Sequence, residues 1–460
     1  MTRIEALTRR LLQPVDGAWL AALRVLFGLT MAVSMWRFVA NGWIEAFFVR
    51  PGFFFKFWGF EWVAPLSAPA MHTLVWGLVG LALCLAAGLF FRVTAALFAL
   101  GLIYLQLIDV STYLNHYYLA ALLALLLTAS PAGRLWSVDA WLARRLGRSA
   151  GPETVSTAWL YLFRFQVGLV YVFAGLAKLQ PDWLLHAQPL RIWLGASTDL
   201  PLVGPLFTLP WVPLVMSWCG FLFDTFIVAF LLHPRTRLPA YGVVLLFHAL
   251  TRVLFPIGMF PVIMSVAALV FFTPGWPRVL LSRRLSRPPP SPAAVASFAG
   301  WQRAALALGA VYCALQLALP LRYLAYGGNV LWHEQGMRFS WRVMVRAKGG
   351  GTTFVVHSPR LNHTWHVNPR DYLTPMQENE MSSQPDLIVQ LAHHIERDFA
   401  ARGLGPVEVR ADSRAALNGR RSAPLVDPNI DLTRVADGLS QARFVLPAPA
   451  QAPPHTRPVL

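Results

Sequence analysis

The sequence predicts a polytopic α-helical membrane protein of about nine transmembrane helices, followed by a C-terminal extracytoplasmic α+β domain that is mainly β. Three observations predict this fold class. Hydrophobic residues make up 56% of the 460 residues and charged residues only 13%, whereas soluble domains carry about 25% charged residues. Long apolar segments fill the chain up to residue 320. From residue 329 onward the composition changes to that of a soluble domain.

The apolar segments are long enough to cross a bilayer, which takes about 20 mostly apolar residues. The second and third are separated only by Phe91 and Arg92, which predicts a tight hairpin. The third, seventh and eighth are short enough to tilt or to dip into the bilayer. Nine such segments are predicted, at residues 17–38, 72–91, 93–109, 114–130, 157–179, 211–233, 239–254, 257–274 and 301–320.

The positive charges predict the orientation of the chain. The net charge is +17, from 39 Lys and Arg against 22 Asp and Glu. Most of these basic residues flank the apolar segments, so they indicate a lipid bilayer partner and argue against nucleic acid. With the N-terminus in the cytoplasm, 14 basic residues fall in inner segments and four in outer loops. An odd number of spans then places the chain after residue 321 outside the cytoplasm.

We predict three parts along the chain. The transmembrane domain covers residues 1–325 and the extracytoplasmic domain covers residues 326–446. Residues 447–460 are rich in proline and alanine, which predicts a disordered tail.

Within the C-terminal domain, residues 340–346 and 352–357 have strand composition and flank three glycines at 349–351. This pattern predicts a β-hairpin. Further elements are predicted at residues 363–367 (strand), 383–403 (amphipathic helix) and 406–411 (strand).

The fifth span carries a regular row of polar and small residues. Glycines in such a row let another group approach the helix backbone closely. The row therefore predicts half of the wall of a pocket that opens outward. Its members follow helical offsets of 4, 7, 11 and 14 and are Arg164, Gly168, Tyr171, Gly175 and Lys178.

Lys178 is the residue in this row with the clearest chemical meaning. Ionisable residues inside spans are rare and are usually functional or paired. Burial favours the neutral amine, which can take a proton from a weak acid such as a phenol or a hydroquinone. The alternative is that Lys178 extends to the outer interface beside Pro181 and Trp183. The residues themselves leave both interpretations open.

His116 lies near the outer end of the fourth span and is a candidate to bind a quinol oxygen or to carry a proton. A hydrogen-bonded interfacial histidine is the alternative. Asp224 and His248 are interpreted as polar contacts between helices, and Arg24 is predicted to pair with Asp224. The three cysteines lie in apolar segments without metal-ligand spacing, so no metal site is predicted.

Seven segments, in matching order, carry a resemblance to a known family. With them the chain resembles the vitamin K-dependent gamma-carboxylases, and in particular the bacterial members of that HTTM-containing family. The resemblance implies a multi-pass protein of the bacterial inner membrane. The segments are LNHYYL (114–119), YVFAGLAKLQPDW (171–183), FHALTRVLFPIGMFP (247–261), FTPGWPR (272–278), FSWRVMV (339–345), HVNPRDYLTPMQENEMSSQPDLIVQLAHHI (366–395) and DPNIDL (427–432).

The resemblance implies an activity and its reactants. The family's catalytic lysine aligns with Lys178, where it would deprotonate a reduced vitamin K-type naphthoquinone such as menaquinol or phylloquinol. Reaction with O2 gives a strong base, and the quinone leaves as its epoxide. That base removes a γ-proton from glutamate in a protein or peptide, and CO2 adds to give γ-carboxyglutamate, without a metal. The family's functional histidine and the asparagine before it align with His116 and Asn115. Residues predicted to bind the quinol or the substrate are Tyr171, Gly175, Trp341, Arg346 and His248.

The chain also departs from the animal enzymes. Ala177-Lys178 stands where they carry two adjacent lysines, and Arg346 replaces a histidine after the FSW motif. The sequence ends soon after DPNIDL, where the animal enzymes continue, so docking of a propeptide-bearing substrate is not implied. Two alternatives to a complete carboxylase remain: a quinol epoxidase without carboxylation, and a non-enzymatic membrane protein that binds quinone or lipid.

Overall fold

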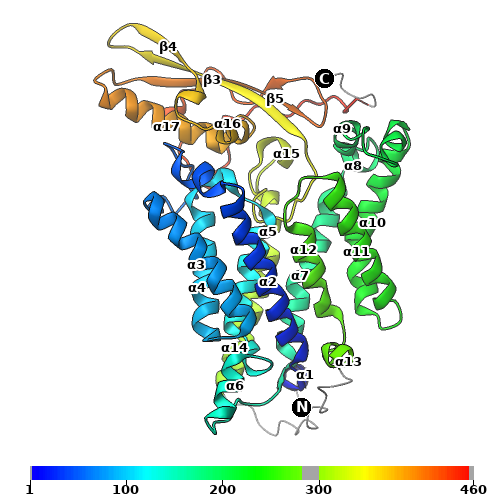
Figure 1. Cartoon of the computed structure of the whole chain (residues 1–460). Helices are drawn as coiled ribbons and strands as arrows, with labels where there is room; N and C mark the ends of the chain where they lie inside the picture. The colour runs from blue at the N-terminus through cyan, green and yellow to red at the C-terminus, as the bar shows by residue number, and fades with distance from the viewer. Residues whose placement is uncertain (1–2, 282–299, 455–460) are drawn as a thin grey trace.

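The computed structural model describes residues 3–281 and 300–454. It has a long helical part with a second domain seated on one end (Figure 1). The N-terminal helix α1 (Arg3–Leu12) and helix α13 (Trp276–Leu281) lie at the opposite end of the helical part. The predicted fold class, a polytopic helical membrane protein with a C-terminal domain that contains β-sheet, is confirmed.

Seven helices among the described residues are long and apolar enough to cross a membrane. All nine predicted spans are helical, but two of them, α5 (Asn115–Ala129) and α12 with η5 (Phe260–Phe271), are shorter than a full span. Of the nine predicted spans, seven are therefore full-length helices within the described residues, and two are shorter apolar helices. The seven are α2 (Ala18–Ala40), α3 (Ala68–Ala87), α4 (Phe91–Ile108), α7 (Thr157–Lys178), α10 (Val212–Leu232), α11 (Arg237–Leu254) and α14 with η6 (Gly300–Ala325).

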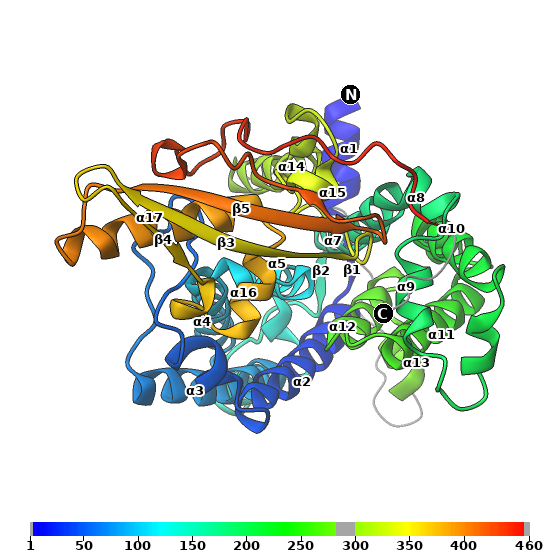
Figure 2. The same ribbon diagram turned by 90° about the horizontal axis from the view of Figure 1, so that it is seen from above.

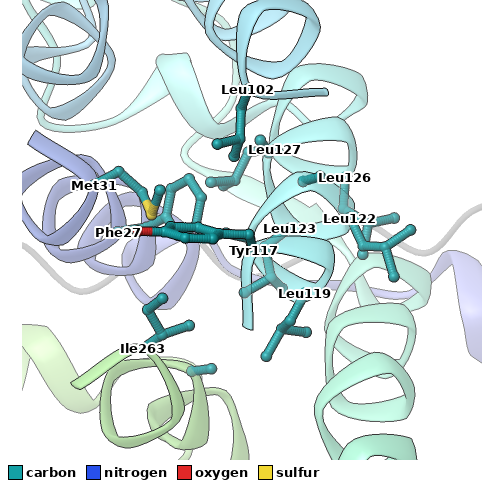
Figure 3. Packing of buried hydrophobic residues seen from close by; sticks show 14 of the residues in the cluster. Phe27, Met31, Leu102, Tyr117, Leu119, Leu122, Leu123, Leu126, Leu127 and Ile263 are labelled. Carbon is teal, nitrogen blue, oxygen red and sulfur yellow. The ribbon is translucent and has the colours of Figure 1, made fainter. Parts of the chain in front are cut away.

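Helix α5 is short because it lies in the core of the helical part. Ten of its 15 residues are buried, as expected for a helix that is apolar on every side. Tyr117 of α5 belongs to one buried cluster with Phe27 and Met31 of α2 (Figure 3). Leu102 of α4 and Ile263 of α12 contribute to the same cluster. A helix surrounded by other helices does not have to match the thickness of the bilayer on its own.

The end of the helical part opposite the C-terminal domain is held by polar contacts. Strands β1 (Pro14–Asp16) and β2 (Thr154–Ser156) pair antiparallel. Arg278 bridges them through Asp16 (2.8 Å) and Glu153 (2.8 Å). Arg24 donates hydrogen bonds to the carbonyl oxygens of Ala132 (2.8 Å) and Leu135 (3.2 Å), and not to Asp224. The predicted Arg24–Asp224 pair is therefore wrong.

The C-terminal domain is built on a four-stranded sheet with the order β4–β3–β5–β6. Figure 2 shows β3 and β5 running across the end of the helical part. The strand predicted at 363–367 and the helix predicted at 383–403 are both present, and the strand predicted at 406–411 extends further. The strands are β3 (Lys348–Ser358), β4 (His363–Val367), β5 (Glu408–Leu417) and β6 (Ala423–Pro424), and the main helices are α16 (Pro375–Met381) and α17 (Pro385–Ala401).

The predicted hairpin over the three glycines is wrong. They belong to β3, which pairs with β5 from Lys348 to His357. A Cβ on Gly350 would lie 2.6 Å from the carbonyl oxygens of Arg414 and Ser382, so the glycine permits a close approach of backbones. The preceding residues 340–346 have turn and irregular backbone instead of a strand.

The structure describes the predicted disordered tail as far as residue 454. Residues 447–454 have no regular secondary structure, but the carbonyl oxygens of Gln451 and Pro454 accept hydrogen bonds from Arg420 (2.7 Å) and Gln188 (3.2 Å). Residues 455–460 lie outside the described part of the chain. Short helices α6 (Val138–Arg145), α8 (Pro181–Leu184), α9 (Leu190–Gly195) and α15 (Val330–His333) complete the fold.

Candidate functional site

Lys178 is the last residue of α7 and is only 5% exposed. Its Nζ donates to Asp224 Oδ2 of α10 at 2.7 Å and to the carbonyl oxygen of Ala174 at 3.2 Å. The Trp183 ring lies 5.2 Å from the same nitrogen. The amine is therefore directed into the protein and paired with a buried carboxylate, and it does not extend to the interface.

Lys178 and Asp224 line an apolar cavity of about 290 Å³ between α7, α10, α11 and α12. This is close to the lower end of the sizes typical of small-molecule sites. Tyr171 and His248 also line it, and the Tyr171 hydroxyl lies 3.1 Å from His248 Nε2. The cavity therefore combines apolar walls with two polar pairs, Lys178–Asp224 and Tyr171–His248. Within the described residues, no group of His, Cys, Asp and Glu is arranged to hold a metal ion.

Gly175 lies at the contact between α7 and α10, and not in the wall of a pocket, where the sequence predicts it. It faces α10, and a Cβ there would lie 2.9 Å from the backbone nitrogen of Thr225 and 3.0 Å from its Cα. It does not belong to the lining of the Lys178 cavity. Its small size brings α7 against α10, which places Lys178 beside Asp224.

We expect Gly175→Ala to lower the free energy of unfolding by about 1–3 kcal/mol, because the added methyl group must displace backbone. The control is Gly80→Ala in α3, where a Cβ would meet nothing within 4 Å. Thermal unfolding in detergent measures both. Equal midpoints for the two variants would contradict the assigned role of Gly175.

His116 and Asn115 line a second cavity, of about 610 Å³. His116 is 8% exposed, and Asn115 Oδ1 accepts a hydrogen bond from the Tyr113 hydroxyl at 2.9 Å. Phe260 contacts both His116 and His248, with ring centroids 6.4 and 5.9 Å apart. The structure therefore places the two predicted groups, His116 with Asn115 and Lys178 with its neighbours, in adjacent cavities.

Residues 339–345, named here the inserted segment, separate these cavities. Val343 and Met344 line both of them. Trp341 is 1% exposed and stacks on Tyr118 with ring centroids 4.9 Å apart, so it anchors the segment in the helical core. Phe339, Trp341 and Met344 all have positive φ, between 53° and 61°. Such φ values are costly for bulky residues and often occur at functional sites.

Arg346 lies in neither of these cavities. It forms an ion pair with Glu334, which also accepts from Lys348 Nζ at 3.0 Å. Arg346 lines a third, polar cavity of about 210 Å³ together with Glu380. Burial raises the pKa of Glu380. Arg346 therefore does not line the Lys178 cavity, and its predicted role in binding the quinol or the substrate stays a prediction.

The C-terminal domain holds the loop that follows Lys178. Asp182 accepts hydrogen bonds from Arg420 at 2.6 and 2.7 Å and from Asn418 at 2.8 Å. Burial raises the pKa of Asp182, but the Arg420 and Asn418 hydrogen bonds outweigh this effect and hold the pKa below its usual value. Trp183, the next residue, donates from its Nε1 to the carbonyl oxygen of Ser217 in α10 at 2.8 Å.

We expect Arg420→Ala to cost about 3 kcal/mol at neutral pH, because it leaves a largely buried carboxylate without its cation. The pKa of Asp182 is lower in the folded than in the unfolded chain. The contribution is therefore present above the unfolded pKa of about 3.9 and is lost as the pH falls below it. Thermal unfolding from pH 3 to 7, beside the exposed neighbour Arg421→Ala, measures it. A cost that is the same at all pH values would contradict the account.

Family models match almost the whole chain. A model of the HTTM domain matches residues 12–276, which is more than half of the sequence, and a model of the vitamin K-dependent gamma-carboxylase lumenal domain matches residues 301–451. The chain belongs to the vitamin K-dependent gamma-carboxylase family. The helices from α2 to α12 lie within the HTTM match, whereas almost all of α14, together with the four-stranded sheet, α16 and α17, lies within the lumenal-domain match. No solved structure matches the chain.

Sequence reasoning about this gamma-carboxylase family member missed part of the site. Asp224 is a polar contact between helices, as predicted, but its partner is Lys178 of α7 and not Arg24. Arg342 and Met344 of the inserted segment were not singled out, although both line more than one cavity. The available signal was their place in the quoted segment FSWRVMV. Spacing alone did not show that this segment enters the helical part.

Proposed function

We propose that the protein is a membrane enzyme that oxygenates a reduced vitamin K-type naphthoquinone to its epoxide and couples this reaction to the carboxylation of glutamate in a protein substrate. The observation that carries the proposal is the buried Lys178–Asp224 pair in an apolar cavity. Membership of the gamma-carboxylase family supports the same reaction class. We also propose that the C-terminal domain lies outside the cytoplasm, in the orientation predicted from the basic residues.

The apolar walls of the Lys178 cavity would hold the naphthalene ring. Phe247 and Phe255 offer flat aromatic surfaces, and Val170 and Met264 offer aliphatic ones. One ring hydroxyl would face Lys178, and the Tyr171–His248 pair would serve a polar group elsewhere on the ring. Isoprenoid side chains are apolar, so the remainder of the quinol would extend into lipid.

Lys178 would act as the base toward the ring hydroxyl. To do so it must be a neutral amine, and Asp224 is the adjacent group that can take its proton. In a low-dielectric site the ion pair competes with the neutral amine and carboxylic acid, because both charges are poorly solvated. The two residues can therefore exchange one proton between Lys178 Nζ and Asp224 Oδ2. When bound, the reduced quinone would supply, through its reaction with O2, the strong base for carboxylation.

The His116 cavity would receive the glutamate side chain. It adjoins the Lys178 cavity through Phe260 and the inserted segment, and it adjoins the polar cavity through Asn115 and Met344. A peptide that enters through the polar cavity would thus reach the boundary of the quinol site without crossing lipid. His116 and Asn115 would orient the side chain.

The test uses purified protein in detergent with reduced menaquinone or phylloquinone, O2, labelled bicarbonate and a glutamate peptide. Quinone epoxide and labelled peptide are measured in the same reaction. We expect both products. Epoxide without labelled peptide would indicate an epoxidase without carboxylation. The absence of epoxide from every quinol would contradict the proposed enzyme and favour a protein that only binds quinone or lipid.

A further inference from the structure

The side chains that line the His116 cavity carry a net positive charge. Three arginines line it, Arg37, Arg252 and Arg342, and no Asp or Glu is among its lining residues. Within the described part of the chain, none of the three lies within ion-pair distance of a carboxylate. Cations that line a cavity without a counter-charge attract an anion to it.

Arg342 is a half-buried cation whose partner among the described residues is a tyrosine and not a carboxylate. Its guanidinium lies over the Tyr323 ring at 4.0 Å from the centroid, and its buried Nε has no hydrogen-bond partner among the described residues. Burial lowers the pKa of Arg342, with only Tyr323 opposing this effect. By contrast, Arg338 pairs with Asp386 and Arg346 pairs with Glu334. The charges of Arg338 and Arg346 are thus balanced by carboxylates of the protein, whereas the charge of Arg342 is not.

Arg342 also has a particular position. It lines the polar cavity as well as the His116 cavity, and so does Asn115. Its neighbours Trp341 and Met344 have positive φ values of 58° and 53°, which fix the local backbone in a strained form. Neither of the other two arginines lines the polar cavity. Arg252 is exposed, and the Arg37 guanidinium lies 5.2 Å from the centre of the Trp43 ring.

We propose that Arg342 binds the γ-carboxylate of the substrate glutamate at the junction of the two cavities. This inference rests on the proposed function and names the residue that would select glutamate. Guanidinium binds carboxylate through two parallel hydrogen bonds, which fixes the orientation as well as the charge. Asn115 lines the same junction and can hydrogen-bond the second side of the carboxylate or the peptide. Arg37 and Arg252 add to the positive potential of the cavity.

The experiment measures peptide binding, so that it does not depend on turnover. A fluorescent glutamate peptide and its glutamine counterpart are titrated by anisotropy into the full-length protein in phosphatidylcholine nanodiscs. The proteins are the wild type, Arg342→Gln, Arg342→Lys and the control Arg410→Gln, an exposed strand residue paired with Glu408. Epoxide formation by the wild type is measured in parallel, and thermal unfolding checks that each variant is folded.

We expect the wild type and Arg410→Gln to bind the glutamate peptide about tenfold or more tightly than the glutamine peptide. Arg342→Gln removes this preference, and Arg342→Lys restores part of it, since lysine keeps the charge but loses the two-point geometry. A preference that persists in Arg342→Gln overturns the inference while leaving the proposed function intact. A wild type without preference also overturns it, and epoxide formation then decides the proposed function separately. Loss of the preference on addition of phosphatidylglycerol assigns the arginines to lipid phosphate and overturns it as well.

Discussion

Substitution of Lys178 by methionine is expected to reduce epoxide formation by a factor of about 10³, within the range that general bases contribute. The amine lies in the apolar cavity, and its removal leaves no base at this position. The single change also leaves Asp224 as a buried carboxylate without its cation, which costs about 3–5 kcal/mol of stability. Epoxide is measured by chromatography at saturating quinol, with thermal unfolding of the same preparation.

A double variant separates chemistry from folding. Lys178→Met with Asp224→Leu removes both charges and replaces them with apolar side chains. Replacement of a buried ion pair in this way is often neutral or stabilising. We expect the double variant to unfold near the wild-type temperature and to remain as inactive as the single variant. Recovery of epoxide formation along with stability would show that Lys178 is only a structural partner.

Substitution of Asp224 by asparagine is expected to lower epoxide formation by a factor of about 10². Asparagine keeps the size of the side chain and can still accept a hydrogen bond from Lys178 Nζ. It cannot take a proton from the ammonium group, so the neutral amine forms less often. Asp224→Glu keeps the carboxylate and should retain more activity than Asp224→Asn, although the longer side chain shifts its position.

Quinol binding distinguishes this role from a structural one. The KM for quinol should change little in Asp224→Asn, because the walls of the cavity are apolar and remain in place. The loss should fall on kcat. An unchanged kcat in Asp224→Asn would contradict the assignment of Asp224 as the proton acceptor for Lys178.

The fold could be predicted from the sequence to the extent that it depends on apolar length. Each predicted span is a helix, because a long apolar segment has no other stable form in a bilayer. The sequence could not show that α5 is surrounded by protein, since that depends on which helices pack around it. The hairpin over Gly349–Gly351 was wrong for a related reason: glycine is a turn signal, yet Gly350 is needed in a strand where Arg414 and Ser382 come close.

The candidate site was predictable where it depends on the cost of burying a charge. Lys178 was found because a charged amine inside a span requires a reason. Its partner Asp224 could not be found, because pairing depends on the rotation of α7 against α10. Gly175 shows that a small residue on a helical face does not by itself indicate a ligand site, because such a residue can instead serve the packing of two helices. The position of residues 339–345 between two cavities is indicated by the family resemblance of FSWRVMV, and not by composition or spacing.

The most direct test of the account is a structure of the protein with a naphthoquinol bound in the absence of O2, so that no turnover occurs. The account predicts the ring in the cavity lined by Lys178, Asp224 and Tyr171, with one hydroxyl oxygen within about 3.2 Å of Lys178 Nζ. A quinol bound in the His116 cavity or against the lipid-facing surface, with Lys178 still paired only with Asp224, would contradict it.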